Sequence, residues 1–323
     1  MTRYAHDWTH SSSMPHRGEV ISAAGHERSE VIRVKLTHTR AVFLMVAVTL
    51  MWSTAGVITR HLEHARSFEV TFWRSFFTLL SLLVILPFFQ GRDVFRKIRH
   101  GGSALWISGL CWSVMFTAFM LALTLTSVAN VLVTLAVGPL FTALVARIFI
   151  GHRIPARTWM AILVAGAGIA YMYGAQVSGG QLAGTLVALC VPVAGAVNWT
   201  LTQRSHAQGQ DIDLVPAVLV GAAISALVTL PLAMPLRASA HDIGLLALLG
   251  LAQLAIPCAL SVVCARVLKA PEIALLALLE VIFGILLAWL GANEVPTQAV
   301  LAGGTLVIGA LVVNELVGWR QRA

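Results

Sequence analysis

Glu280 is the residue whose type and position most directly suggest chemistry. It stands in the apolar run "EIALLALLEVIFGILLAWL", eight residues after Glu272, which is about 12 Å further along a helix. A charged side chain at the centre of a bilayer costs at least about 3 kcal/mol. Glu280 could therefore carry a proton or contact the amine of a substrate, or it could be a neutral acid that hydrogen-bonds a neighbouring helix.

Arg74 is the basic counterpart, five residues after Glu69 in the run "EVTFWRSFFTLLSLLV". Its guanidinium offers a fork of donors that could bind a substrate carboxylate through two hydrogen bonds. Alternatively, the long side chain could reach the nearer membrane interface and pair with Glu69. The second interpretation is favoured because Arg74 lies about one turn inside the predicted helix.

Three prolines interrupt apolar runs: Pro139, Pro192 and Pro257. Each removes a helix hydrogen bond and frees the carbonyl four residues earlier. Free carbonyls are tolerated where a partner or a cavity satisfies them, so the prolines mark either packing kinks or hinges beside a cavity. Gln253 lies four residues before Pro257 and adds a polar side chain there, which favours a cavity wall at this position.

Two tryptophans, Trp52 and Trp112, lie away from the ends of the apolar runs. Their rings could line an apolar pocket or fill the space between packed helices. Asn130, near the start of a run, is a weaker candidate for a polar contact. The candidate substrate-binding residues are thus Glu280, Trp112, Gln253, Trp52, Arg74 and Asn130.

The composition requires a membrane, because 58% of the 323 residues are hydrophobic and only 11% are charged. A bilayer core about 30 Å thick needs about 20 apolar residues per helix. Ten such stretches occupy residues 41–59, 70–89, 103–124, 129–149, 158–175, 182–203, 214–236, 243–265, 272–290 and 297–318. Lipid cannot satisfy backbone polar groups, so each stretch is expected to be a helix. The sequence predicts an all-α integral membrane protein with ten transmembrane helices.

Positive charges are distributed unevenly between the connections. With the N-terminus inside, the cytoplasmic segments carry fifteen Lys and Arg residues and the opposite side carries four. Cytoplasmic loops are enriched in these residues, so we expect both termini in the cytoplasm of a bacterium and the chain in its inner membrane. The net charge of +8 does not indicate nucleic-acid binding, because the basic residues separate apolar runs instead of gathering on one face.

Residues 1–38 form a polar segment with scattered histidines, which we expect to be a disordered cytoplasmic tail. The spacing of these histidines matches no metal-ligand pattern. The four cysteines fall inside apolar runs and are interpreted as small packing residues. We therefore predict no metal and no cofactor.

The chain contains an internal repeat with a period of 141 residues. This shift aligns Pro155 with Pro296, Gly168 with Gly309, Ala161 with Ala302 and Ala129 with Ala270. Each half then holds five helices, the first in 41–175 and the second in 182–318. An odd number of spans places the halves in opposite orientations, as in many secondary transporters. Glu280 then lies opposite Pro139, at the centre of the other half.

Two longer segments have a recognisable pattern: "SVANVLVTLAVGPLFTALVARIFIGHRIPARTWMAILVAGAGIAYM" and "APEIALLALLEVIFGILLAWLGANEVPTQAVLAGGTLVIGALVV". They resemble the fourth-to-fifth and ninth-to-tenth helix pairs of the drug/metabolite transporter superfamily, in its ten-helix EamA-domain branch. "MWSTAGVITR", "VTFWRSFFTLLSLLV" and "GTLVALCVPVAGAVNWTLTQR" extend the resemblance over residues 41–318. It implies export of small metabolites, often amino acids, through a central cavity shared by the repeats.

One turn departs from the family pattern. The family commonly has a Gly-Glu-Arg-like turn after the fourth helix, whereas this sequence has Gly151, His152 and Arg153. The second half keeps the acid, Glu294, after Asn293. We interpret the turn as structural in both halves.

Other classes of function have weaker support. An intramembrane protease would place histidines among buried catalytic residues, yet the eleven histidines lie in the tail, the loops or the helix ends. Asp211 and Asp213 form the only acidic pair of the kind a prenyl-transfer enzyme would need twice. A phosphate-binding GxxxxGK[ST] loop is missing from the sequence. A passive channel or a non-transporting receptor remains an alternative.

The sequence therefore predicts a non-enzymatic secondary transporter in a lipid bilayer, acting as a monomer or a homodimer. Its small-molecule substrates would be neutral or aromatic amino acids, since one acid, one arginine and tryptophans offer handles for an amine, a carboxylate and an uncharged side chain. The alternative is a multidrug exporter of lipophilic cations.

Overall fold

The computed structural model describes residues 36–91, 93–150, 155–174, 179–207, 214–265, 267–268 and 270–320. The regular elements in these ranges are all helices, as the apolar pattern predicts. The tail expected for residues 1–38 lies outside the described residues up to residue 35, and α2 begins at His38. The turn at Gly151 to Arg153 also lies outside them.

The first half of the chain contains α2 (His38–Thr59), α3 (Phe68–Gln90), α4 (Asp93–Arg99), α5 (Ser103–Leu125), α6 (Val128–Leu135), α7 (Gly138–Ile150) and α8 (Ala156–Gly174). The second half contains α9 (Gly179–Ala207), α10 (Val215–Ala233), α11 (Ala240–Leu248), the π-helix η1 (Leu249–Ala255), α12 (Ile256–Cys264), α13 (Ala270–Ala292) and α14 (Gln298–Arg320).

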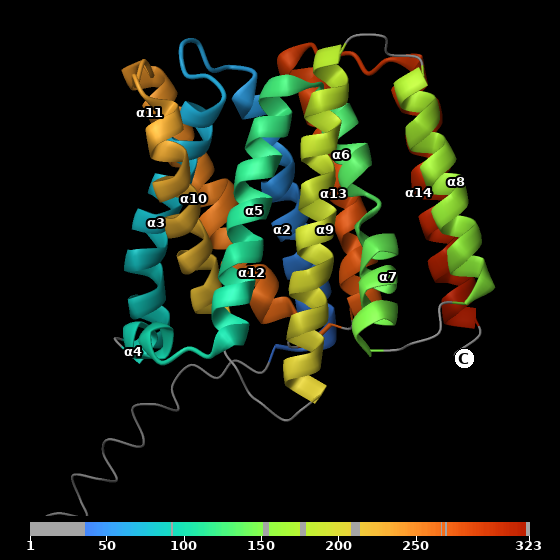
Figure 1. Cartoon of the computed structure of the whole chain (residues 1–323), viewed down its shortest axis with the longest axis horizontal. Helices are drawn as coiled ribbons and strands as arrows, with labels where there is room; N and C mark the ends of the chain where they lie inside the picture. The colour runs from blue at the N-terminus through green and yellow to red at the C-terminus, as the bar shows by residue number, and fades with distance from the viewer. Residues whose placement is uncertain are drawn as a thin grey trace, which may run out of the picture. The chain divides into compact units, whose positions relative to one another are not determined.

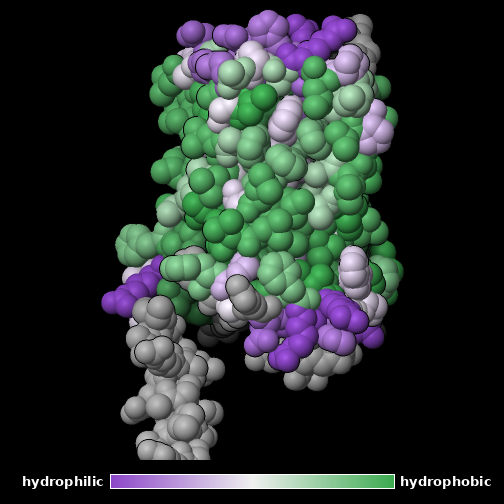
Figure 2. Space-filling model, turned by 90° about the vertical axis from the view of Figure 1, so that its left-hand side faces the viewer, coloured by the Kyte–Doolittle hydropathy of each residue, from purple (hydrophilic) through white to green (hydrophobic). Residues whose placement is uncertain are grey.

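Eight stretches of the described residues are long and apolar enough to cross a membrane. Two shorter apolar helices, Ala156–Tyr171 and Leu276–Ala292, occupy the places where the sequence predicts two further spans. The surface is likewise divided into apolar and polar regions. Figure 2 shows a hydrophobic belt around the helices, with hydrophilic residues gathered at its two ends. Such a belt fits the lipid core, and the polar ends fit the headgroup regions.

The helices run back and forth between the two ends of the bundle (Figure 1). The connection between α2 and α3 lies at one end, here called the α2–α3 end, and α4 lies at the other, the α4 end. The most extensive packing joins α5 to α9 and α10, α2 to α13, α3 to α10, and α8 to α14. Buried apolar residues fill these interfaces.

Two of the predicted spans are not regular helices. The span expected at 129–149 is divided into α6 and α7 by Ala136 and Val137. Pro139, the second residue of α7, has no N–H to bond the carbonyl of Leu135, so the helix breaks there. The span expected at 243–265 contains η1, which ends two residues before Pro257. The sequence predicts an interruption at each of these two prolines, but not the π-helix at Leu249–Ala255.

Buried carboxylates hold the connections at the α2–α3 end. Asp242, in the first turn of α11, accepts hydrogen bonds from the backbone N–H groups of Glu63, His64 and Ala65 at 2.8, 2.9 and 2.9 Å. Glu69 accepts two more from the backbone N–H groups of residues 237 and 238, at 2.7 and 2.8 Å. The α2–α3 connection is thereby fixed to α11, and the α10–α11 connection is fixed to α3.

Candidate functional site

A cavity of about 1080 Å³ lies at the centre of the helices. It is bounded by α2, α3, α5, α6, α7, α9, η1, α12 and α13. Its lining extends to Ala265 and Leu268, where α12 ends at the α4 end. Toward the α2–α3 end the same helices pack together through buried apolar residues that include Ala55, Leu123 and Leu249. The cavity therefore reaches toward the α4 end and is covered at the other.

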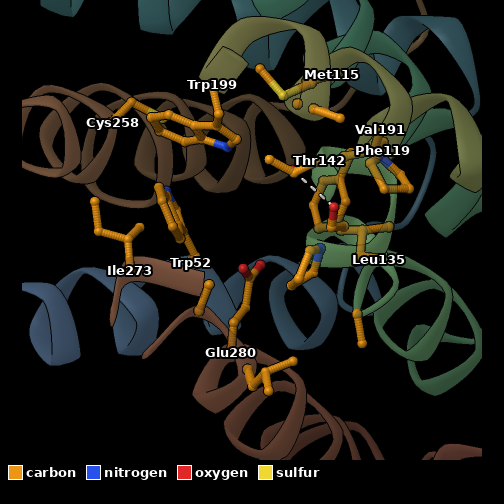
Figure 3. Close-up of a pocket in the computed structure, with 18 of the residues that line it drawn as sticks. Trp52, Met115, Phe119, Leu135, Thr142, Val191, Trp199, Cys258, Ile273 and Glu280 are labelled. Atoms are coloured by element: carbon orange, nitrogen blue, oxygen red, sulfur yellow. Dashed lines mark hydrogen bonds between the residues drawn. The ribbon is translucent and has the colours of Figure 1, made fainter. Parts of the chain in front are cut away.

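Aromatic side chains dominate one part of the lining. The indoles of Trp112 and Trp199 meet edge to face with centroids 6.4 Å apart, and Trp112 also contacts Phe116 at 5.5 Å. The Trp52 and Trp199 side chains both border the cavity (Figure 3). The predicted role of Trp52 and Trp112 as lining residues is compatible with this placement. Trp112 is also only 6% exposed, so it serves the packing between helices as well.

Arg74 lies in the cavity wall, buried to 2% exposure. Its Nε and Nη2 donate hydrogen bonds to Oε1 of Gln253 at 3.1 and 2.8 Å. The guanidinium also lies over the Phe119 ring, 5.5 Å from its centroid. The Nη1 group is buried and has no hydrogen-bond partner among the described residues. One edge of the guanidinium is thus held by the protein and one nitrogen is left without an acceptor.

The interface interpretation of Arg74 is wrong. Its side chain does not reach the membrane surface, and Glu69 binds the backbone of the α10–α11 connection instead. The physical reason is that Gln253 offers a buried acceptor to two guanidinium nitrogens, which compensates for the loss of water.

Gln253 is positioned by the π-helix. Its Oε1 accepts both bonds from Arg74, and its Nε2 donates to the Trp52 carbonyl at 3.2 Å. The π-helix packs closely on α3, since a Cβ at Gly250 would meet the Phe77 Cβ at 2.6 Å. Single π-helical turns are frequent at functional sites because they redirect one side chain without ending the helix. Here that side chain connects α2, α3 and η1.

Glu280 projects its carboxylate into the cavity (Figure 3). The carboxylate has no hydrogen-bond partner among the described residues, so the structure does not contain the interhelical bond of the packing interpretation. The Ser53 hydroxyl bonds the backbone carbonyl of Glu280 at 3.2 Å, not its side chain. Glu280 and Arg74 both line the cavity but form no direct ion pair.

The remaining candidates are divided between the cavity and its surroundings. Pro139 and Pro192 line the cavity, whereas Pro257 precedes the lining residue Cys258. Asn130 is not a lining residue. It lies at the start of α6, where its Nδ2 donates to the hydroxyls of Thr126 and Thr185 at 3.0 and 2.9 Å.

Several lining residues have no distinguishing signal in the sequence. They include Met45, Met115, Phe119, Trp199, Cys258 and Ile273. Trp199 lies four residues from the end of a predicted span and so has the pattern of an interfacial tryptophan. Cys258 was expected only to pack, and its thiol is indeed free and buried, but it also borders the cavity. Within the described residues, no cluster of three His, Cys, Asp or Glu side chains is arranged to hold a metal ion.

Apolar helices long enough to cross a bilayer, arranged around a central cavity with two ionisable side chains in its lining, define a multi-pass membrane protein. Residues 39–174 match the model of the EamA-like transporter family.

A solved crystal structure has the same fold over most of its length. It is 18% identical, has a TM-score of 0.58, and the alignment covers 88% of this chain and 99% of that chain. At this identity the likeness concerns the fold alone. None of the curated proteins compared matches the chain.

Proposed function

We propose that the protein is a secondary transporter that exports small metabolites, foremost neutral or aromatic amino acids, by alternating access of the central cavity. The observation that carries the proposal is the cavity itself. Its volume of about 1080 Å³ exceeds most ligand pockets, which measure about 300–1,000 Å³, and it is lined by aromatic side chains with few fixed charges.

The polar groups in this lining suit an amino acid. Glu280 presents a carboxylate for an ammonium group, and Arg74 in the same lining has one unbonded nitrogen. Trp52, Trp112 and Trp199 offer apolar surface for a side chain. An exporter must release its substrate, so we expect an affinity between about micromolar and millimolar, equivalent to about 4–8 kcal/mol.

Alternating access would depend on ten spans arranged as two inverted five-helix repeats. The boundaries of the elements support the repeat. A shift of 141 residues moves Ala270, where α13 starts, to within one residue of Val128, where α6 starts. The same shift moves Gln298, the start of α14, to within one residue of Ala156, the start of α8.

The packing supports the same symmetry. Exchanging the halves converts the contact of α2 with α13 into that of α9 with α6 and α7, and the contact of α5 with α9 into that of η1 and α12 with α2. The contacts of α3 with α10 and of α8 with α14 join equivalent helices of the two halves, so the exchange leaves them unchanged. Rocking of one repeat against the other would then move access to the cavity from one end to the other.

We place the protein in a bacterial inner membrane with both termini in the cytoplasm, because fifteen Lys and Arg residues fall in the segments assigned to the cytoplasm. Only Arg60, Arg66 and Arg237 fall in those assigned to the opposite side, since Arg74 lies in the cavity wall. The cavity then reaches toward the cytoplasm, where an exporter takes up its substrate. Reporters fused at residue 320 and inserted at residue 178 test this. Cytoplasmic signal at 320 with periplasmic signal at 178 is expected, and labelling of both from one side would overturn the topology.

Cells provide the first test of export. Overproduction should raise resistance to toxic analogues of neutral or aromatic amino acids, and Glu280→Gln should reduce this gain at equal protein abundance. A multidrug exporter of lipophilic cations is the second candidate, favoured by the unbonded Glu280 carboxylate amid tryptophans. Resistance to lipophilic cations without resistance to any analogue would shift the assignment to that function.

A further inference from the structure

The cavity wall contains a basic and an acidic side chain, Arg74 and Glu280, and the described residues hold only the first in place by hydrogen bonds. Arg74 is fixed, since Gln253 engages two of its nitrogens and Phe119 lies against its face. Its Nη1 is the part of the guanidinium without an acceptor among the described residues. An N–H buried without an acceptor is costly, so a ligand oxygen that reaches Nη1 from the cavity would be stabilised there.

Glu280 has the opposite character. Its carboxylate extends from α13 into open cavity space (Figure 3) and receives no hydrogen bond from the described residues. Both residues line the cavity, yet they form no ion pair with each other. A positive and a negative side chain thus belong to the wall of one cavity.

We propose that Arg74 and Glu280 together select substrates by net charge, with the substrate carboxylate on Arg74 Nη1 and its ammonium group on Glu280. This inference rests on the proposed function and narrows it to zwitterions. In a site of low polarity an unpaired charge is costly. An amine leaves Arg74 without a counter-charge and an acid leaves Glu280 without one, whereas a zwitterion satisfies both.

The chain supplies matched controls for this idea. Arg60 and Glu294 are a second arginine and glutamate, which contact each other directly at the α2–α3 end and do not line the cavity. Arg60→Gln and Glu294→Gln therefore remove the same charges from the protein without removing them from the cavity.

The experiment compares three ligands that share one aromatic side chain: phenylalanine, phenethylamine and 3-phenylpropionate. Their affinities for the purified full chain in detergent are measured through quenching of tryptophan fluorescence, because Trp52, Trp112 and Trp199 line the cavity. Uptake of labelled phenylalanine into proteoliposomes is measured in parallel. We expect the wild-type protein to bind phenylalanine at least about tenfold more tightly than the other two, the effect of one charge-assisted hydrogen bond.

Each substitution should remove one part of this preference. Glu280→Gln should bring phenylalanine and 3-phenylpropionate to similar affinity, and Arg74→Met should do the same for phenylalanine and phenethylamine. Arg60→Gln and Glu294→Gln should leave the ranking unchanged. If Arg74→Met fails to fold, Glu280→Gln decides alone, since it keeps the shape of the side chain.

The failures are distinguishable. Phenylalanine uptake by the wild type, with no zwitterion preference or with a ranking that Glu280→Gln leaves unaltered, overturns the charge-pair site and keeps the proposed amino-acid export. If none of the three ligands is bound or taken up, the charge-pair site is overturned. The proposed amino-acid export is overturned as well if threonine and methionine are not taken up either.

Discussion

Arg60 at the end of α2 donates a hydrogen bond to the carboxylate of Glu294 between α13 and α14. Each partner also binds a further helix end. Arg60 donates to the carbonyls of Leu123 and Thr126 at 2.8 Å each, and Glu294 accepts from the Val128 N–H at 2.6 Å. The pair thus ties α2, α5, α6 and the α13–α14 connection together at the covered end of the cavity. The acid of this turn is structural, as the sequence suggested.

Breaking this pair should loosen the α2–α3 end. Arg60→Gln or Glu294→Gln removes hydrogen bonds to charged partners, so we expect a loss of about 1–3 kcal/mol in the free energy of unfolding, measured in mixed detergent micelles. A cysteine at Ala55, buried below the pair, should react faster with a thiol reagent in a background without the native cysteines. Arg96→Gln, which breaks an exposed pair with Asp93, serves as the control. Equal rates of reaction with the thiol reagent in all variants would contradict a role of the Arg60–Glu294 pair in keeping this end of the cavity covered.

Gln253→Ala should destabilise the protein as well as change its selectivity. From the sequence alone we expect this change to alter substrate preference more than abundance. The structure adds a cost, because the Arg74 guanidinium would lose both of its side-chain hydrogen bonds while staying buried. We expect a loss of about 2–4 kcal/mol, visible as a lower thermal midpoint in size-exclusion assays. Gln253→Glu, which retains the acceptor oxygens, should recover most of it, and wild-type stability of Gln253→Ala would show that Arg74 finds another acceptor.

The role of Trp112 in selectivity is better tested by a smaller aromatic side chain than by alanine. Its indole packs on Phe116 and Trp199, and its Cβ lies 2.4 Å from the place of a Cβ at Gly221. From the sequence alone we expect Trp112→Ala to change substrate preference more than abundance. Removing a buried tryptophan side chain costs about 3–5 kcal/mol, however, so the structure predicts that this change lowers abundance. Trp112→Phe should keep the fold and enlarge the cavity. Competition uptake assays should then favour larger aromatic amino acids over threonine, and an unchanged order would argue against a selective role for this wall.

The sequence predicted best the features that depend on the pattern of apolar residues, namely the positions of the helices and the presence of an unusual acid. Helix positions follow from runs of about 20 apolar residues, and Glu280 stands out because an acid in such a run is rare. The partner of Arg74 was not predictable, because Gln253 lies 179 residues away and reaches Arg74 through a π-helical turn that no residue pattern announces. Asn130 has the polarity of a site residue, but its contacts are with Thr126 and Thr185, and only the packing of α6 reveals this.

Glu280 also provides a test of energy coupling. Its carboxylate is the ionisable group that extends unbonded into the cavity, so it is the candidate carrier of a proton. If transport is coupled to protons, Glu280→Gln should abolish the dependence of uptake on a pH gradient while leaving expression intact. The measurement is uptake into proteoliposomes with and without the gradient. Wild-type transport that ignores the gradient would exclude coupling and leave exchange or facilitated diffusion.

The most direct test of the central claim is transport by the purified protein itself. Proteoliposomes should be offered a panel of labelled neutral and aromatic amino acids, such as threonine, methionine and phenylalanine, beside lipophilic cations of similar size, with empty liposomes as the control. Our account predicts saturable uptake of at least one amino acid, half-saturated between about micromolar and millimolar concentration, and weaker uptake of the cations. Uptake of lipophilic cations alone, or of no compound above the empty liposomes, would contradict it.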